Sequence, residues 1–188
     1  MKSYVYWLLL GAWGVMGFAL QGAALQARGP NGSDVVELGG LKSRAPADWA
    51  EQVCYDPHCT KQYRLEPVND DAEYAYVSVY FLGKGKVATA AEYVKGWKGM
   101  FLPPEGQTMK EAAKVRHFKL SGASVTFLDV HGDYKGISGD QATRRENYRL
   151  LGVYFATPRG VYAIDLFGPA DTVEVYRRQF ENWVKAFK

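Results

Sequence analysis

The sequence predicts an α+β fold, in which an antiparallel β-sheet of five to seven strands carries two main helices packed on it. Short stretches rich in β-branched and aromatic residues follow one another as hairpins. Two longer stretches, one in the middle of the chain and one at its carboxyl end, instead repeat apolar residues at helical spacing. Strands and helices do not alternate regularly along the chain, which argues against a parallel, doubly wound sheet.

The amino terminus has the pattern of a secretory signal peptide. Lys2 supplies a positive charge, residues 4–20 form an uncharged apolar run, and residues 22–27 are mostly small. A retained membrane anchor is the alternative, because the apolar run is close to the lower limit of the roughly 17–25 residues that cross a bilayer. The expected organisation has three parts, a signal peptide at residues 1–27, a linker at 28–35 and a single domain at 36–188.

The charge balance narrows the classes of partner. The chain has 188 residues, and its 23 lysines and arginines against 20 aspartates and glutamates give a formal net charge of +3. A balance so close to zero gives no electrostatic reason to expect a nucleic-acid partner. We expect a periplasmic or secreted monomer, which touches the membrane only if the signal segment is retained.

The amino-terminal half is expected to contribute three strands. Residues 35–41 form the first and residues 62–65 a short second, with a turn at 44–49 between them. Tyr74 to Phe81 is the strongest strand signal, because its alternation leaves both faces substantially apolar. Helices on opposite faces of the sheet would cover both sides of this strand. If the helices share one face, an aromatic surface remains, made of Tyr74, Tyr76 and Tyr80.

The middle helix follows this strand. Thr89 and Glu92 have the spacing of a capping box, in which each side chain binds the backbone amide of the other residue. Pro103 and Pro104 prevent the helix from continuing. An apolar stripe marks the buried face of the helix and consists of Ala90, Tyr93, Val94, Trp97 and Phe101.

The carboxyl-terminal half adds two hairpins and a final helix. The hairpins are expected at residues 115–120 with 124–134 and at residues 148–156 with 161–167, and a polar segment at 136–147 separates them. The helix that follows is expected to begin at an Asp171 cap, with Glu174 completing a capping box. Its apolar stripe contains Val173, Tyr176, Phe180, Trp183 and Phe187.

This order of elements, with Pro46 and Trp49 after the first strand and an aromatic carboxyl-terminal helix, resembles the PsbP-like superfamily of αβα sandwiches. The resemblance implies a sheet between two helical layers and a non-enzymatic binding or assembly role, without a cofactor. It implies no residue roles, because the shared motifs are structural glycines, prolines and packing aromatics. The stretches similar to an exported bacterial branch are Trp97–Gly106, Val125–Gly132, Tyr148–Gly152 and Gly168–Val173.

Cys54 and Cys59 are the only cysteines of the sequence. In an exported protein, two cysteines this close in a proline-containing loop indicate a local disulfide. The alternative is a metal site, because Asp56 and His58 lie in the same loop and could join two thiolates. We expect the disulfide, since ligands so crowded along the chain cannot easily reach a tetrahedral arrangement.

Asp129, His131 and Asp133 alternate along one expected strand, so they project from the same face of it. A row of carboxylate, imidazole and carboxylate can hold a divalent cation or orient a general base. The alternative function is therefore a metal-binding protein or a metal-dependent hydrolase. The other interpretation is the polar end of a strand that leaves the sheet at Gly132. Because no second cluster completes a site, we expect neither a catalytic residue nor a resident metal.

The function that we expect is a non-catalytic binding or accessory module of the cell envelope. Aromatic side chains are numerous, and those left over from the core can stack on a peptide or a glycan. The expected contacts are Tyr74, Tyr76 and Trp97, and the expected partner is an envelope protein, a peptide or a glycan. This expectation fails if the tyrosines are wholly buried under a helix.

Overall fold

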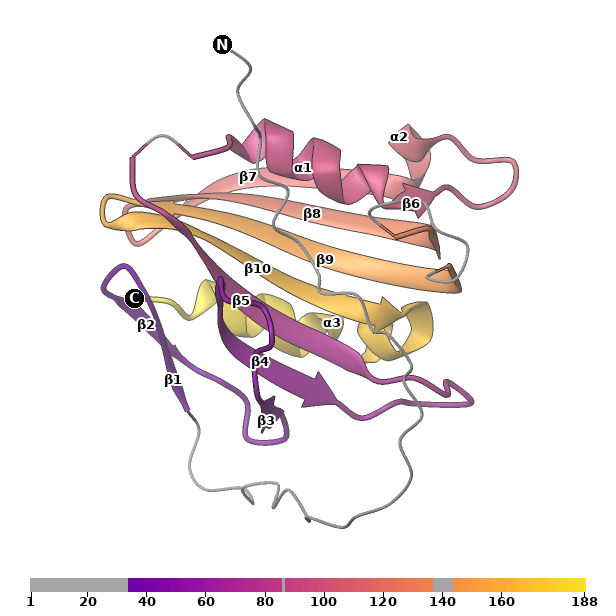
Figure 1. Ribbon diagram of the computed structural model, residues 1–188, viewed down its shortest axis with the longest axis horizontal. Coiled ribbons are helices and arrows are strands. Elements are labelled where there is room, and N and C mark those ends of the chain that lie inside the picture. Colours follow the sequence, from indigo (N-terminus) through magenta and orange to yellow (C-terminus); the bar gives the residue numbers. More distant parts are fainter. Residues whose placement is uncertain (1–33, 86, 137–143) are drawn as a thin grey trace.

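The computed structural model describes residues 34–85, 87–136 and 144–188. The expected signal peptide and most of the linker therefore lie outside the described residues, as do residues 137–143 of the expected polar segment. Among the helices of the described part, none combines the length and the apolar character that crossing a bilayer requires. The described chain forms one large twisted sheet with helices on both of its faces and a small separate hairpin (Figure 1).

The main sheet has eight strands in the order β3-β4-β5-β10-β9-β8-β6, with β7 also paired to β8. Every described pairing is antiparallel, as expected. The expectation of five to seven strands is wrong because β3 and β6, with three and two residues, are too short to show an alternating pattern. The strands are β3 Ala50–Gln52, β4 Cys59–Leu65, β5 Ala75–Gly83, β6 Phe101–Leu102, β7 Ala113–Leu120, β8 Ala123–Tyr134, β9 Arg145–Thr157 and β10 Gly160–Pro169.

The single strand expected at residues 35–41 is instead a hairpin of β1 (Val35–Leu38) and β2 (Leu41–Arg44). Gly39 and Gly40 form its turn with φ angles of 58° and 95°, which glycine adopts without steric cost. Two consecutive residues with positive φ match the tight turns that join antiparallel strands. The glycine pair is therefore the signal that divides this segment into two strands.

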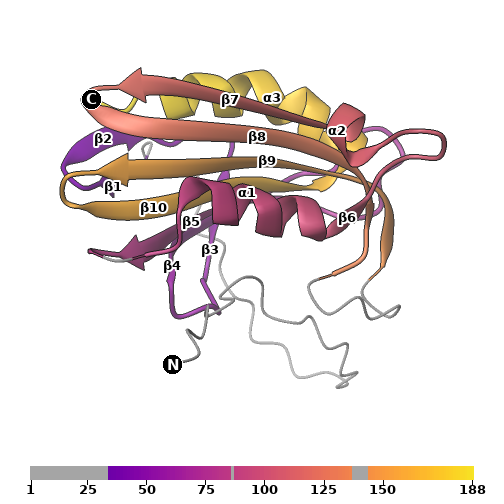
Figure 2. The ribbon, with the colours of Figure 1, turned by 90° about the horizontal axis from the view of Figure 1, so that it is seen from above.

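Helices α1 (Ala90–Gly99) and α3 (Ala170–Lys185) pack on opposite faces of the sheet, and the short helix α2 (Met109–Ala112) precedes β7 (Figure 2). This arrangement confirms the expected αβα sandwich and explains why both faces of β5 are apolar. Each face has its own core. The buried aromatics on the α3 side are Trp49, Tyr63, Phe127, Phe155, Phe180, Trp183 and Phe187, and those on the α1 side are Tyr80, Trp97, Phe101, Tyr148 and Tyr154.

Helix α1 begins as expected and ends earlier than expected. The capping box is present, because Thr89 accepts a hydrogen bond from the Glu92 amide and donates its own amide to the Glu92 carboxylate at 2.6 Å. The helix stops at Gly99, so Phe101 is not part of its apolar stripe. Phe101 pairs instead with Tyr134 of β8, and this strand pairing replaces the expected last turn of the helix.

The apolar stripe of α3 is confirmed except for Phe187, which is buried in the same core but follows the end of the helix, and the expected cap is wrong. The residue at the N-cap position is Pro169, and Asp171 lies inside the first turn. Asp71, far away in the sequence, accepts a hydrogen bond from the Thr172 amide at 3.0 Å and another from the Thr172 hydroxyl. A carboxylate near the positive end of the helix dipole stabilises the helix, whether it comes from the first turn or from a distant part of the sequence. The cap therefore comes from tertiary structure and has no local sequence signal.

Candidate functional site

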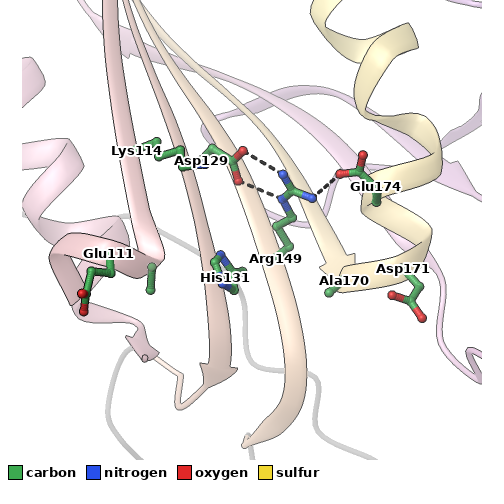
Figure 3. A pocket seen from close by; sticks show the side chains of 9 residues that line it. Glu111, Lys114, Asp129, His131, Arg149, Ala170, Asp171 and Glu174 are labelled. Atoms are coloured by element: carbon green, nitrogen blue, oxygen red, sulfur yellow. Dashed lines mark hydrogen bonds and ion pairs between the residues drawn. The ribbon is translucent and has the colours of Figure 1, made fainter. Parts of the chain in front are cut away.

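A polar pocket of about 300 Å³ lies on the α3 side of the sheet, where α3 begins (Figure 3). Residues of α2, β7, β8, β9 and the first turns of α3 form its lining. Two alanines, Ala112 and Ala170, are the apolar members of this lining, and the others are charged residues and one histidine. Such a lining favours a small polar ligand over an apolar one.

Arg149 holds the pocket together. Its Nε and Nη2 donate to the two carboxylate oxygens of Asp129, both at 2.8 Å, and its Nη1 donates to Glu174 (Figure 3). The hydrogen bonds to Asp129 raise the pKa of Arg149 against the opposing effect of burial. A bidentate pair of this kind fixes the orientation of both side chains. The guanidinium group thus connects β8, β9 and α3 in one place.

The register of the sheet explains why these residues meet. His131 on β8 lies directly opposite Arg149 on β9, so Arg149 reaches diagonally to Asp129, two positions before His131 on β8. Glu174 does not complete a capping box, contrary to the expectation. It accepts hydrogen bonds from Arg177 and Arg149. Both bonds lower the pKa of Glu174, and the bond from Arg177 has the larger effect.

His131 and Lys114 are the two basic groups of the pocket that remain unpaired. Within the part of the chain that the structure describes, neither side chain has a hydrogen-bond or ion-pair partner. Lys114 of β7 lies opposite Asp129 in the sheet register. Figure 3 shows His131 between Glu111 and Arg149. These two groups can therefore bind a ligand without first breaking an existing contact.

Asp133 does not line the pocket with Asp129 and His131. Its place on the strand follows the expected alternation, since Tyr134 after it packs in the α1-side core. The register of β8 on β9 shifts at this end of the strand, where two positions of β8 lie opposite three of β9, so the extra residue of the bulge belongs to β9. Asp133 instead accepts a hydrogen bond from Arg144 at 2.8 Å, which lowers the pKa of Asp133.

The geometry contradicts the alternative of a metal site in this row. Arg149 binds both oxygens of Asp129, and Arg144 binds Asp133, so arginines occupy the two carboxylates that would ligate a cation. In residues 34–85, 87–136 and 144–188, no three histidine, cysteine, aspartate or glutamate side chains gather closely enough to hold a metal ion.

The expected disulfide between Cys54 and Cys59 is present. Both sulfur atoms are used in this bond, so the alternative metal site with Asp56 and His58 is wrong. Asp56 has a different role, because its Oδ1 accepts a hydrogen bond from the His58 amide at 2.7 Å. This contact and the disulfide together fix the loop between β3 and β4.

The three aromatic residues expected to contact a ligand lie in different surroundings. Trp97 is fully buried, because the apolar face of α1 packs on the sheet, so the expected ligand contact is wrong for this residue. Tyr74 is 37% exposed, and the Arg64 guanidinium lies over its ring, 4.4 Å from the centroid. Tyr76 is half-buried on β5. Ligand contacts by Tyr74 and Tyr76 stay a prediction.

The sequence analysis missed Arg149, and it also missed Lys114 and Glu111 of the pocket lining. Arg149 is the most informative of these. It lies in a strand whose middle is apolar, and its place opposite His131 depends on a register that the fold alone reveals. The available signal was a basic residue next to an apolar strand core, because an arginine that is largely buried needs a carboxylate partner.

Comparisons with known proteins give a likeness in fold. The structure is similar to cyanobacterial PsbP from Synechocystis, with a TM-score of 0.49, 15% identity and coverage of 95% of this chain and 98% of that one. It is also similar to a protein of unknown function from Pseudomonas aeruginosa, with a TM-score of 0.46, 12% identity and coverage of 82% of this chain and 95% of that one. No family model matches the sequence, and no curated protein matches it. A likeness at this level concerns the fold alone and assigns no activity.

Proposed function

We propose that this chain is an exported, non-catalytic binding or accessory module of the cell envelope, and that its ligand occupies the pocket at the start of α3. The observation that carries the proposal is the pairing of the charged groups there. Arg149 neutralises Asp129, whereas His131 and Lys114 stay unpaired in the described part of the chain. Groups locked in ion pairs shape a pocket, and unpaired groups provide hydrogen bonds to a ligand.

The lining also supports a class of ligand. Lys114 and His131 offer hydrogen-bond donors, while Asp171 and the Glu111 oxygen that does not cap α2 offer carboxylate acceptors on other sides of the pocket. A ligand with both donors and acceptors, such as a short peptide or a glycan, fits this mixture better than a lipid or a simple anion. The disulfide supports export, because such bonds persist in oxidising compartments.

Calorimetric titration with a panel of tripeptides and disaccharides tests the binding site. We expect one probe class to bind, and we expect His131→Ala and Lys114→Ala each to weaken its binding by about tenfold, the value of one hydrogen bond to a charged group. Lys119→Ala is the matched control, because Lys119 lies on the same strand outside the pocket and bonds to Ser124. Unchanged affinity in both pocket variants, or conversion of a bound probe into product, would contradict the proposal.

Amino-terminal sequencing of the protein recovered from the periplasm tests export. We expect a mature chain that starts at Arg28, since residues 22–27 supply the small side chains at which a signal peptidase cuts. Recovery of the intact chain in the membrane fraction would support the anchored alternative instead.

A further inference from the structure

The α1 side of the sheet contains a buried acid that the pocket does not use. Asp165 of β10 is 1% exposed, and among the described residues no other aspartate, glutamate, lysine, arginine or histidine is buried. Ala163 and Phe167, two positions before and after it, belong to the α1-side core. Because side chains alternate along a strand, Asp165 points toward the same face as these two residues.

The hydrogen bonds of Asp165 are incomplete. Ser78 of β5 lies directly opposite in the sheet register and donates to the carboxyl group from both its hydroxyl and its backbone amide. Gln62 in turn donates to the Ser78 hydroxyl at 3.2 Å. The second carboxyl oxygen, Oδ2, is buried and has no hydrogen-bond partner. An ionised carboxylate with a bare oxygen in an apolar core is strongly disfavoured relative to the neutral acid.

Helix α1 closes the core next to this carboxyl group. Gly152 of β9 lies opposite Asp165, on the other side from Ser78, and Trp97 packs on it so closely that a Cβ there would be 2.8 Å from the indole Cε3. Trp97 is fully buried, and its Nε1 also lacks a hydrogen-bond partner. Water can therefore solvate an ionised Asp165 only if the indole, and with it α1, moves away from the sheet.

The titratable neighbours of Asp165 do not supply a compensating positive charge. Tyr80 of β5 and Tyr134 of β8 face it, and the pKa of each is raised by burial first and then by the negative charge of Asp165. Asp56 of the β3–β4 loop acts on Tyr80 in the same direction. The neighbours from β9 and α1, a glycine and a tryptophan, do not titrate. Burial raises the pKa of Asp165 to about 7, against the opposing hydrogen bonds from Ser78.

We propose that protonation of Asp165 controls how firmly helix α1 packs on the sheet. With the neutral acid, the helix is closed over the core. When the carboxyl group releases its proton to the solvent, water reaches Oδ2 and α1 loosens, while α3 on the opposite face stays in place. The protein thereby has two states of its α1 face, selected by the pH around neutrality, and this regulation is independent of ligand binding in the pocket.

Hydrogen exchange of the backbone amides tests the proposal in the purified protein. After correction for intrinsic exchange rates, we expect the protection of α1 amides to fall on the order of tenfold or more between about pH 5.5 and about pH 8.5, and that of α3 amides to stay constant. Asp165→Asn should remove the difference. Asp133→Asn is the matched control, because its carboxyl group is partly exposed and paired with Arg144, and it should keep the response. Equal α1 protection at both pH values, or an unchanged response in Asp165→Asn, would overturn the proposal.

A second measurement needs no variant. Carbon NMR of the Asp165 carboxyl group is expected to titrate with a midpoint near 7, together with the chemical shifts of the α1 amides. A midpoint in the ordinary range of aspartates, about 4, would overturn the proposal even if Asp165→Asn does not fold.

Discussion

The two faces of the sheet hold their acidic side chains in opposite ways. On the α3 side, Asp129 lies at the wall of a pocket, and Arg149 binds both of its oxygens. On the α1 side, Asp165 is buried, and one of its oxygens has no partner. Burial favours the neutral form of Asp165. The two carboxyl groups thus differ in depth and in partner, because Asp165 is buried without a cation whereas Asp129 is at a pocket wall beside one.

Removal of the indole that closes the α1 side is expected to have the largest effect on stability. Trp97→Ala leaves a large cavity, and we expect it to lower the free energy of unfolding by about 3–5 kcal/mol. Urea denaturation measures the change. Tyr74→Ala, at a partly exposed aromatic residue, is the control and should cost about 0.5–1 kcal/mol. Equal losses in the two variants would contradict close packing of α1 on the sheet.

The pH dependence of the unfolding free energy distinguishes the two faces, because a rise in pH weakens the contribution of Asp165 and strengthens that of Glu174. The pKa of Asp165 is raised by burial from 3.8 to about 7, so its contribution to stability is complete below the unfolded value and is lost as the pH rises through the folded value. Glu174 has a pKa lowered by Arg177 and Arg149, so its contribution is present above its unfolded value and is lost as the pH falls through the lowered one.

Urea denaturation at about pH 5 and about pH 8 measures the Asp165 part, which linkage places at roughly 3 kcal/mol or less in favour of the lower pH. Asp165→Asn should narrow the difference between the two pH values, since the amide does not titrate. An unchanged difference in this variant would mean that other groups cause the pH dependence.

Loss of the arginine on the α3 side is expected to have a smaller effect. Arg149→Met leaves Asp129 without a partner and removes one of the two arginines from Glu174, which should cost about 1–3 kcal/mol in unfolding free energy. The control is Arg177→Met, which removes two helical ion pairs on the surface, with Glu174 and Glu181, and should cost about 0.2–0.5 kcal/mol for each pair. If the two variants lose equally, Arg149 does not hold the pocket together.

The cap of α1 provides the smallest effect. Thr89→Ala removes the hydroxyl that accepts the Glu92 amide and should lower the unfolding free energy by about 1 kcal/mol, measured by thermal unfolding with circular dichroism. Thr89→Ser keeps the hydroxyl and should retain most of the stability. A loss in the serine variant as large as that in the alanine variant would show that the methyl group matters more than the cap.

Features that depend on neighbouring residues could be predicted from the sequence. The capping box of α1 and the disulfide are both present, because each involves residues a few positions apart. The bond from Thr172 to Asp71 spans 101 positions, and the pairing of Arg149 with Asp129 requires the register of β8 on β9, so neither has a local signal. Register is set by the whole hydrophobic pattern of a sheet.

Asp133 shows how far alternation along a strand can predict a site. Its position on β8 follows the expected alternation, because Tyr134 after it packs in the α1-side core and the extra residue of the bulge lies in β9. Its partners could not be predicted in this way. Arg144 and Asn147 bind its carboxylate from the segment that leads into β9, and no local pattern in the sequence places them there.

The position of β10 has a consequence for the assembly of the molecule. This strand is the last in the described chain, yet it lies between β5 and β9 and joins the two halves of the sheet. A polypeptide truncated before Gly160 would leave β5 and β9 as two open edges, each with a row of unsatisfied peptide groups that invites aggregation. The central layer can therefore close only after the chain has been synthesised through Pro169, and pairing between residues so far apart in the sequence makes folding slow.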